Sequence, residues 1–304
     1  MELYKYQGAG NDFLIGDNRG GDISLTRGQI VSLCDRRYGI GADGLMLLEN
    51  PGPVLNAASC VSHAAPAFRM TYYNSDGSGG MMCGNGGRCI AAFASFLGIR
   101  GMDFIAADGM HTAQILSTDG KTSIVRLGMK DVSGITACGS AGGDVPPGYF
   151  LDTGTRHFVK IVSSPGDCDV VVEGRRIREA AEFAPEGTNV NFAMPDREVL
   201  RVRTYEKGVE AETFACGTGI TASAIAVWHH ASNLPESERG PFSGLFRTEA
   251  GGRVSVEVRA LRDSLAVDFL PSGIKSCGHE PSGLGAACGV HLTGPATYIG
   301  KIII

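Results

Sequence analysis

Hydrophobic and polar residues alternate in short runs along the whole chain, a pattern typical of strands with one buried face. In the first half the alternation predicts strands at 3–16, interrupted by a Gly-rich turn at 8–12, and at 44–49, 68–74, 103–107, 112–116 and 123–127. In the second half it predicts strands at 157–162, 170–172, 200–205, 253–258, 265–269 and 290–304. We therefore expect sheets to dominate the structure.

Helical spacing of apolar residues is confined to a few segments. Residues 25–37 show it, with Thr26 as a candidate N-cap. Two further runs, 87–97 and 217–231, are rich in Ala and almost wholly apolar, which indicates buried helices. Many short strands combined with two strongly buried helices favour an α+β fold.

The same short motif precedes both buried helices. Met82-Cys83-Gly84-Asn85-Gly86 opens the first, and Ala215-Cys216-Gly217-Thr218-Gly219 opens the second. Such an internal repeat predicts two pseudo-symmetric halves. We place the N-terminal half, which carries Cys83, at 1–128 together with 290–304, and the C-terminal half, which carries Cys216, at 129–289.

Composition and charge argue against nucleic acid and membranes as partners. The chain has 304 residues, of which 43% are hydrophobic and 19% charged, so an ordinary globular protein of about two domains is expected. Its net charge of −5 lacks the basic excess typical of nucleic-acid binding. Because the sequence shows neither a membrane-spanning apolar run nor the order of a signal peptide, we expect a cytoplasmic protein without a membrane partner.

The cysteines indicate thiol chemistry rather than metal binding. Nine cysteines, an odd number, occur in a chain without a secretory signal, which argues against a disulfide framework. No Cys-x-x-Cys pair is present, so a metal site is not expected. Most of these cysteines should be reduced thiols, and several should be plain buried hydrophobes.

Cys83 and Cys216 stand apart because each precedes a buried helix. A thiol at a helix N-terminus lies near the positive end of the helix dipole, which can lower its pKa from about 8.5 to between about 3.5 and 7.5. The adjacent glycines allow a carboxylate to approach the helix-end amides. A single Cys-Gly at a helix start is more often a small packed residue, but the matched pair favours chemistry.

Two such thiols, facing one carbon from opposite sides, could invert its configuration. One thiolate would remove a proton and the opposite thiol would deliver another, while the helix ends stabilise charge on the neighbouring carboxylate. This mechanism needs neither pyridoxal phosphate nor a metal, so no cofactor is expected. The substrate would be a small molecule that carries a carboxylate beside the reacting carbon.

A competing motif is Gly39-Ile40-Gly41-Ala42-Asp43-Gly44, which has the Gly spacing of a dinucleotide site. In such a site the loop follows a strand and opens a helix. Here it follows a helical pattern and opens a predicted strand, so we discount nicotinamide or flavin binding.

At these motifs the sequence closely resembles the diaminopimelate epimerase family. The similarity runs almost end to end and includes GAGNDF at 8–13, RRYGIGADG at 36–44, YNSDGS at 73–78, MCGNGGRC at 82–89, GTNVNF at 187–192, TYEKGVEAETFACGTG at 204–219 and LTGPATYIG at 292–300. The resemblance implies two halves, each with strands around a central helix, and an active site in the cleft between them. It also implies a homodimer.

The resemblance further implies roles for particular residues. Cys83 and Cys216 would be the acid/base pair, with His157 assisting Cys83 and Glu206 assisting Cys216. The substrate would be held by side chains and helix-end amides of Asn11, Asn74, Gly84, Asn85, Asn189, Glu206, Lys207, Gly217 and Thr218.

Three departures from the family pattern concern the far end of the substrate. Thr155-Arg156-His157 replaces a frequent Asn-Pro-His, Lys207 replaces Arg, and Gly44 stands where some members carry Gln. Arg156 is a candidate replacement for the missing contact. The sequence thus predicts conversion of LL-diaminopimelate to the meso isomer, for lysine and cell-wall synthesis. A related two-cysteine racemase acting on another amino acid, such as histidine, is the alternative, and a non-catalytic binding protein is a third possibility that the intact catalytic positions disfavour.

Overall fold

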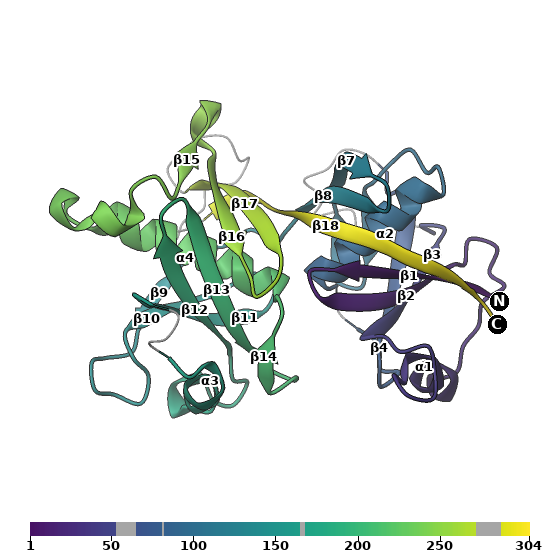
Figure 1. Cartoon of the computed structure of the whole chain (residues 1–304), viewed down its shortest axis with the longest axis horizontal. Coiled ribbons are helices and arrows are strands. Elements are labelled where there is room, and N and C mark those ends of the chain that lie inside the picture. Colours follow the sequence, from purple (N-terminus) through teal and green to yellow (C-terminus); the bar gives the residue numbers. More distant parts are fainter. Residues whose placement is uncertain (53–64, 81, 165–167, 272–286) are drawn as a thin grey trace. The chain divides into compact units, whose positions relative to one another are not determined.

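The computed structural model describes residues 1–52, 65–80, 82–164, 168–271 and 287–304. They form two compact units: unit 1 holds Met1–Gly128 with Thr293–Ile304, and unit 2 holds Met129–Leu292. The sequence places the second boundary at 289/290. The structure places it three residues later, inside the single long strand β18 (Ala287–Ile303), which begins in unit 2 and ends in unit 1 (Figure 1).

The described residues of unit 1 form two helices and several strands. The helices are α1 (Arg27–Cys34) and α2 (Gly84–Phe96). The strands, besides β18, are β1 (Glu2–Gly8), β2 (Asn11–Asp17), β3 (Gly44–Glu49), β4 (Phe68–Asn74), β5 (Phe104–Ala106), β6 (Gly109–His111), β7 (Ala113–Asp119) and β8 (Thr122–Gly128).

Unit 2 is built in the same way. Its helices are α3 (Val170–Arg178) and α4 (Gly217–Asn233), with short 3₁₀ turns η3 (Ala181–Phe183), η4 (Glu236–Glu238), η5 (Gly240–Phe242) and η6 (Ala250–Gly252). Its strands, besides β18, are β9 (Thr136–Cys138), β10 (Gly148–Asp152), β11 (Arg156–Ile161), β12 (Asn189–Asp196), β13 (Val199–Glu206), β14 (Ala211–Thr213), β15 (Arg247–Thr248), β16 (Val254–Arg259) and β17 (Ser264–Pro271).

Strand pairing repeats between the units. From β1 to β6, successive neighbours pair antiparallel, parallel, antiparallel, parallel and antiparallel. The series β10, β11, β12, β13, β16, β17 pairs in the same order. In each series one helix follows the second strand and another follows the fourth. The internal repeat predicted from the two Cys-Gly motifs is therefore a repeat of the fold.

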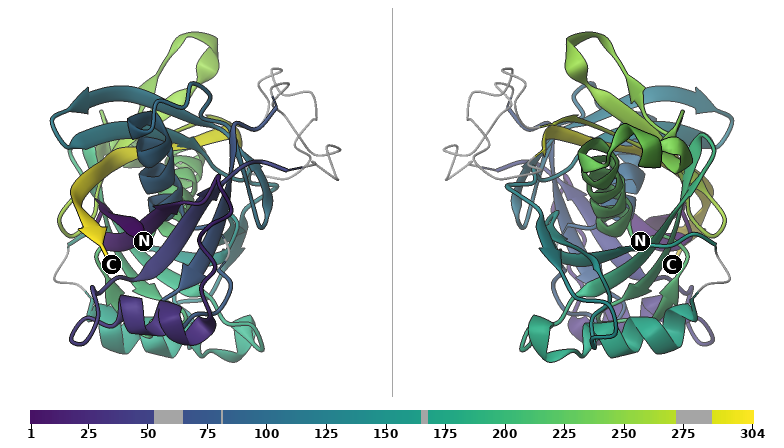
Figure 2. Two further views of the ribbon diagram at one scale, coloured as in Figure 1. Left: turned by 90° about the vertical axis from the view of Figure 1, so that its right-hand side faces the viewer. Right: turned by 90° about the vertical axis from the view of Figure 1, so that its left-hand side faces the viewer.

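In each unit, helices cover both faces of the strands. In unit 1, α1 packs Ile30 and Cys34 against Leu45 and Leu47 of β3, and α2 lies on the opposite face against Met46. Because both faces of β3 are buried, residues 44–48 are apolar without alternation, and the strand ends with the charged Glu49. In unit 2, α3 covers one face of the sheet in the same way, and α4 packs against β10 to β13, β16 and β17 (Figure 2).

Most predicted elements are confirmed, and one is wrong. The strand predicted at 170–172 is the first turn of α3, because the Asp169 side chain accepts hydrogen bonds from the amides of Val171 and Val172 and starts a helix. By contrast, Thr26 caps α1 as predicted, through a capping box with Gln29.

Candidate active site

Each cysteine of the repeated motif is the N-cap residue of the helix that follows it. Cys83 caps α2, whose first intrahelical bond runs from the Gly87 amide to the Cys83 carbonyl at 2.7 Å. Cys216 caps α4, with the matching bond from Ile220 at 2.8 Å. Both cysteines are thiols, half-buried at Cys83 and 8% exposed at Cys216. The helix-end amides beside each thiol suit a carboxylate.

In unit 1 a chain of side-chain hydrogen bonds leads from α2 to the start of β2. Arg88 Nη2 donates to Asn85 Oδ1 at 2.8 Å, Asn85 Nδ2 donates to Asn11 Oδ1 at 2.7 Å, and Asn11 Nδ2 donates to Asp43 Oδ2 at 2.9 Å. Arg88 is fully buried and also donates to the Gly84 carbonyl at 3.3 Å. This chain fixes the first turn of α2 and the predicted substrate residue Asn11.

A network of charged side chains holds Asp43, the hydrogen-bond acceptor of Asn11, in place. Asp43 accepts from Arg36 at 2.6 Å, and Asp12 is bonded to both Arg36 at 2.6 Å and Lys5 at 2.9 Å. Burial of Asp12 acts to raise its pKa, but hydrogen bonds from Arg36 and Lys5 outweigh it, so the pKa lies below its usual value. The sequence motifs contained Asp43 and Arg88, but their supporting role was missed because it runs through Asn11, which is 32 positions from Asp43 and 74 from Asn85.

Asn74 ends β4 and lies opposite Gly44 of β3. Its side-chain amide donates to Ser78 Oγ at 3.0 Å and so also stabilises the turn that follows. A Cβ on Gly44 would meet Tyr72 Cε2 at 2.4 Å and the Tyr73 carbonyl at 2.6 Å. Gly44 therefore has no room for a side chain, because Tyr72 fills the space.

In unit 2 a second chain of hydrogen bonds joins Cys216 to His157. Cys216 Sγ lies 3.4 Å from Thr218 Oγ1, Thr155 Oγ1 donates to Thr218 Oγ1 at 3.1 Å, and Thr155 Oγ1 lies 2.9 Å from His157 Nε2. His157 is fully buried on β11, and this burial lowers its pKa to about 3. The sequence predicted that His157 assists Cys83, which stays a prediction; inside unit 2 the histidine is connected to Cys216.

The remaining predicted residues of unit 2 lie at the ends of β12 and β13. Asn189 Nδ2 donates to the Arg156 carbonyl at 3.1 Å, and Asn189 Oδ1 accepts from the Lys207 amide at 2.8 Å. Glu206, the last residue of β13, is half-buried and corresponds in the repeat to Asn74 at the end of β4. Arg156 is paired with Glu186 at 2.7 Å, so its charge is already engaged within the unit.

Of the other described cysteines, Cys288 is in a disulfide, and three are unsuited to acid/base work near neutral pH. Burial raises the pKa of Cys89 to about 12 and the pKa values of Cys34 and Cys138 to about 11. These thiols therefore stay protonated, as expected for structural positions.

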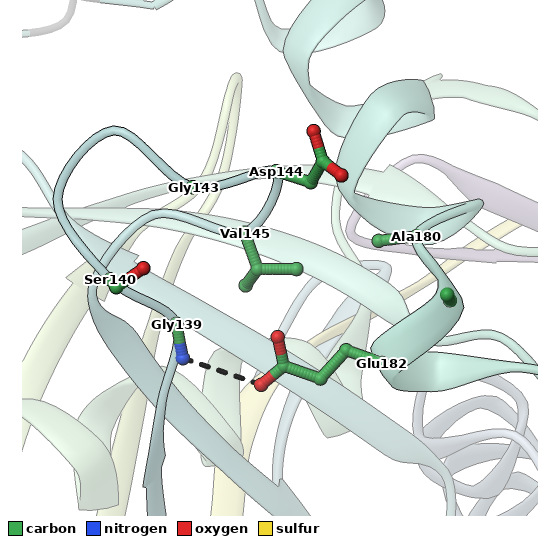
Figure 3. Close-up of a pocket in the computed structure, with 8 residues that line it drawn as sticks. Gly139, Ser140, Gly143, Asp144, Val145, Ala180 and Glu182 are labelled. Atoms are coloured by element: carbon green, nitrogen blue, oxygen red, sulfur yellow. Dashed lines mark hydrogen bonds between the residues drawn. The ribbon is translucent and has the colours of Figure 1, made fainter.

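The pocket in Figure 3 is separate from these residues. It lies in unit 2 between the loop before β10 and the segment from α3 to η3, with Gly139 N donating to Glu182 Oε1 at 3.3 Å at its edge. None of the predicted site residues lines it. Among the described residues, no group of three or more metal-ligating side chains gathers, and no helix has the length and apolarity needed to cross a membrane.

Comparison with known proteins decides the family. Residues 3–128 and 149–244 match the family described as diaminopimelate epimerase. The chain belongs to the diaminopimelate epimerase family. A curated diaminopimelate epimerase of Flavobacterium psychrophilum is 43% identical over 75% of this chain and 81% of its own length. Those of Chlorobaculum tepidum and Aquifex aeolicus are 43% and 39% identical over 72% and 74% of this chain, and 80% of their own lengths.

Solved structures confirm the fold of the family. A probable proline racemase of Agrobacterium radiobacter aligns with a TM-score of 0.62 over 100% of this chain and 92% of its own, at 14% identity. A phenazine biosynthesis protein of the PhzF family from Bacillus anthracis gives 0.60 over 100% and 99%, at 13% identity. The predicted α+β architecture of two similar halves is therefore confirmed.

Proposed function

We propose that this isomerase converts LL-diaminopimelate to meso-diaminopimelate, in lysine and cell-wall precursor synthesis, with Cys83 and Cys216 as its acid/base pair. The observation that carries the proposal is the repeat: it puts a cysteine at the same helix-capping position in both units of a chain that belongs to this family. A protein needing one nucleophile has no use for a second cysteine at the equivalent position.

In the proposed reaction, one thiolate takes the α-proton of the substrate and the other thiol gives its proton to the opposite face of the same carbon. The electron pair left by the first step delocalises into the adjacent carboxylate. The amides of Gly84, Asn85, Gly217 and Thr218 would hold that carboxylate, since hydrogen-bond donors fixed in advance stabilise developing charge. After each turnover the two thiols have exchanged protonation states.

The mechanism requires both thiols to reach one α-carbon. We propose that Glu206 assists Cys216 and that Asn11, Asn74, Asn189 and Lys207 bind the far ammonium and carboxylate of the substrate. An Asn amide suits such a ligand because it both donates and accepts. Lys207 keeps the positive charge of the usual Arg but not its bidentate fork.

The proposal is tested by incubating the reduced protein with LL-diaminopimelate and separating the stereoisomers. We expect the meso isomer to accumulate, whereas L-histidine should keep its configuration. Inversion of L-histidine without reaction of diaminopimelate would instead identify a racemase of another amino acid; no finding favours that alternative.

We also propose that the protein works in the cytoplasm as a homodimer. The chemistry needs two reduced thiols, which a reducing compartment maintains. An aromatic cluster on unit 1 supports an interface: Phe96 stacks on Tyr298 at 5.7 Å yet stays 58% exposed, and Ile299 is 48% exposed. Sedimentation should give the mass of two chains for the native protein and of one chain for Phe96→Asp; a native monomer would refute the proposal.

A further inference from the structure

Thr155 occupies a place in unit 2 that the repeat assigns to Asn11 in unit 1. Phe13 pairs with Gly44 in parallel, and His157 pairs with Asn189 in the same way, so these two strand pairs correspond in register. Counting back two residues aligns Asn11 with Thr155. Each contacts the second residue of its cysteine-capped helix, Asn85 in unit 1 and Thr218 in unit 2.

The direction of the hydrogen bonds in unit 2 can be worked out from Asn191. Its Nδ2 atom lies 3.0 Å from the Phe158 carbonyl, which can only accept, so this atom is the donating nitrogen. The same nitrogen lies 3.1 Å from His157 Nδ1 and donates to it. Thr204 Oγ1 donates to Asn191 Oδ1 at 3.0 Å, which holds the amide in this orientation.

It follows that the proton of the neutral His157 ring is on Nε2. Burial lowers the pKa of His157 to about 3, so the ring carries a single proton, and Nδ1 is already an acceptor. Nε2–H then donates to Thr155 Oγ1, and the Thr155 hydroxyl donates onward to Thr218 Oγ1. Thr218 Oγ1 receives that bond, which leaves its own hydrogen available to its other partner, the Cys216 sulfur.

The corresponding chain in unit 1 runs away from its helix. Arg88 donates to Asn85, Asn85 to Asn11, and Asn11 to the Asp43 carboxylate. Its donors therefore point toward Asp43, whereas the donors of unit 2 point toward Cys216. The backbone therefore repeats between the two units, whereas the two chains of side-chain hydrogen bonds donate in opposite directions.

We propose that Thr155 is a positioning residue that orients the Thr218 hydroxyl as a donor to the Cys216 sulfur, so that Cys216 is the thiolate of the resting protein. The proposal deepens the proposed function and rests on it for its catalytic meaning. A sulfur that accepts a hydrogen bond is stabilised as the anion, in addition to the effect of the helix N-terminus.

The ionisable groups near this chain are those at the ends of strands packed against α4. Asp152 of β10 acts on the His157 ring, Arg156 of β11 is paired with Glu186, and Glu206 ends β13. These groups are left unchanged in the test, so that differences between variants report the hydroxyls.

The test measures how fast iodoacetamide alkylates each cysteine as a function of pH, resolved by peptide mass spectrometry, in the reduced full-length protein. The thiolate alone reacts, so the midpoint of the profile gives the pKa of that thiol. Loss of a hydrogen bond to a charged group corresponds to about one to two pH units. We expect Thr218→Val to raise the Cys216 midpoint by that amount, and Thr155→Val to raise it by less, because Thr155 acts through Thr218.

Three further variants make the result specific. Thr155→Ser keeps the hydroxyl and should restore the native midpoint, and Thr155→Ala repeats the loss with a smaller side chain. Thr153→Val removes a different hydroxyl that donates to the Thr218 carbonyl at 3.0 Å, and it should leave the Cys216 midpoint in place.

Superimposable Cys216 profiles for the native protein, Thr155→Val and Thr155→Ala would overturn the inference, as would a native Cys216 midpoint above that of Cys83. The assay needs no substrate, so its failure is distinct from that of the proposed function. A protein that epimerises diaminopimelate while its Cys216 profile ignores Thr155 refutes only the inference; a responsive profile without epimerisation refutes only the proposed function.

Discussion

Replacing Gly219 by Ala should destabilise unit 2, although Ala is the better helix former. A Cβ at this position, in the first turn of α4, would lie 2.3 Å from Asn191 Oδ1 and 3.3 Å from His157 Cε1. Asn191 is fully buried and held by hydrogen bonds with Phe158, His157 and Thr204. The added methyl group therefore cannot fit unless α4 or Asn191 moves.

The expected cost follows from three terms. Overpacking a well-filled interior costs about 1–3 kcal/mol. Shifting Asn191 weakens at least one buried hydrogen bond, which costs about 1 kcal/mol. The helix propensity of Ala over Gly returns up to about 1 kcal/mol. The free energy of unfolding should therefore fall by about 2 kcal/mol, which lowers the urea midpoint by about 1 M for a slope near 2 kcal/mol per M.

Trp228 provides the assay, because it is the only tryptophan of the chain, lies on α4 and contacts Phe269 with ring centroids 5.8 Å apart. Its fluorescence during urea unfolding reports unit 2. Gly240→Ala is the matched control, since a Cβ there has no atom within 4 Å. If the midpoint of Gly219→Ala equals or exceeds that of Gly240→Ala, the close approach of α4 to Asn191 is wrong.

Three further predictions concern the residues that support the site. The pKa of His157 is lowered to about 3 from about 6.5, so the unfolded chain binds a proton on this ring more readily than the folded protein does. The free energy of unfolding should therefore fall as the pH drops from about 6.5 toward 3, by up to about 1.4 kcal/mol per pH unit. In His157→Gln, the free energy of unfolding measured by Trp228 fluorescence should depend less steeply on pH. Because the pKa of Asp12 is lowered in the folded protein, its carboxylate contributes stability above about pH 4, and this contribution disappears in acid. Asp12→Asn should therefore be less stable than the native protein by about 1 kcal/mol at neutral pH. The thermal unfolding curves of Asp12→Asn and of the native protein should converge at low pH. The free energy of unfolding of Arg88→Lys, measured by thermal unfolding at neutral pH, should be about 2 kcal/mol lower than that of the native protein. A lysine ammonium lacks the planar fork by which Arg88 donates to both Asn85 and the Gly84 carbonyl. Unchanged stability would refute the supporting role of Arg88.

Local pattern predicted the elements whose burial follows a simple period. The strands at 44–49 and 68–74 were predicted with the bounds that the structure shows, because their apolar runs end at Gly and Asn turn residues. The predicted helix at 87–97 begins earlier, at Gly84, since Arg88 fixes a first turn whose glycines have low helix propensity. The hydrophobic pattern of the sequence could not predict this start, because it depends on tertiary contacts that override helix propensity.

The candidate site was predictable as far as its motifs repeat. The two Cys-Gly motifs identified both helix N-caps, and family resemblance supplied the other residues. The link from Cys216 to His157 was missed because it depends on Thr155 and Thr218, which are 63 positions apart in sequence. The sequence does contain one sign that Asn11 and Thr155 correspond, because a glycine precedes each of them. In the structure both glycines, Gly10 and Gly154, have positive φ.

The most direct test of the central claim is the reaction of LL-diaminopimelate in D2O, followed by mass spectrometry and separation of stereoisomers. A two-thiol mechanism predicts that each meso product carries one deuterium at the inverted carbon, because the proton it receives comes from a solvent-exchanged thiol. Cys83→Ala and Cys216→Ala should each abolish inversion while remaining folded. Meso product without deuterium, or inversion that survives the loss of either cysteine, would contradict the account.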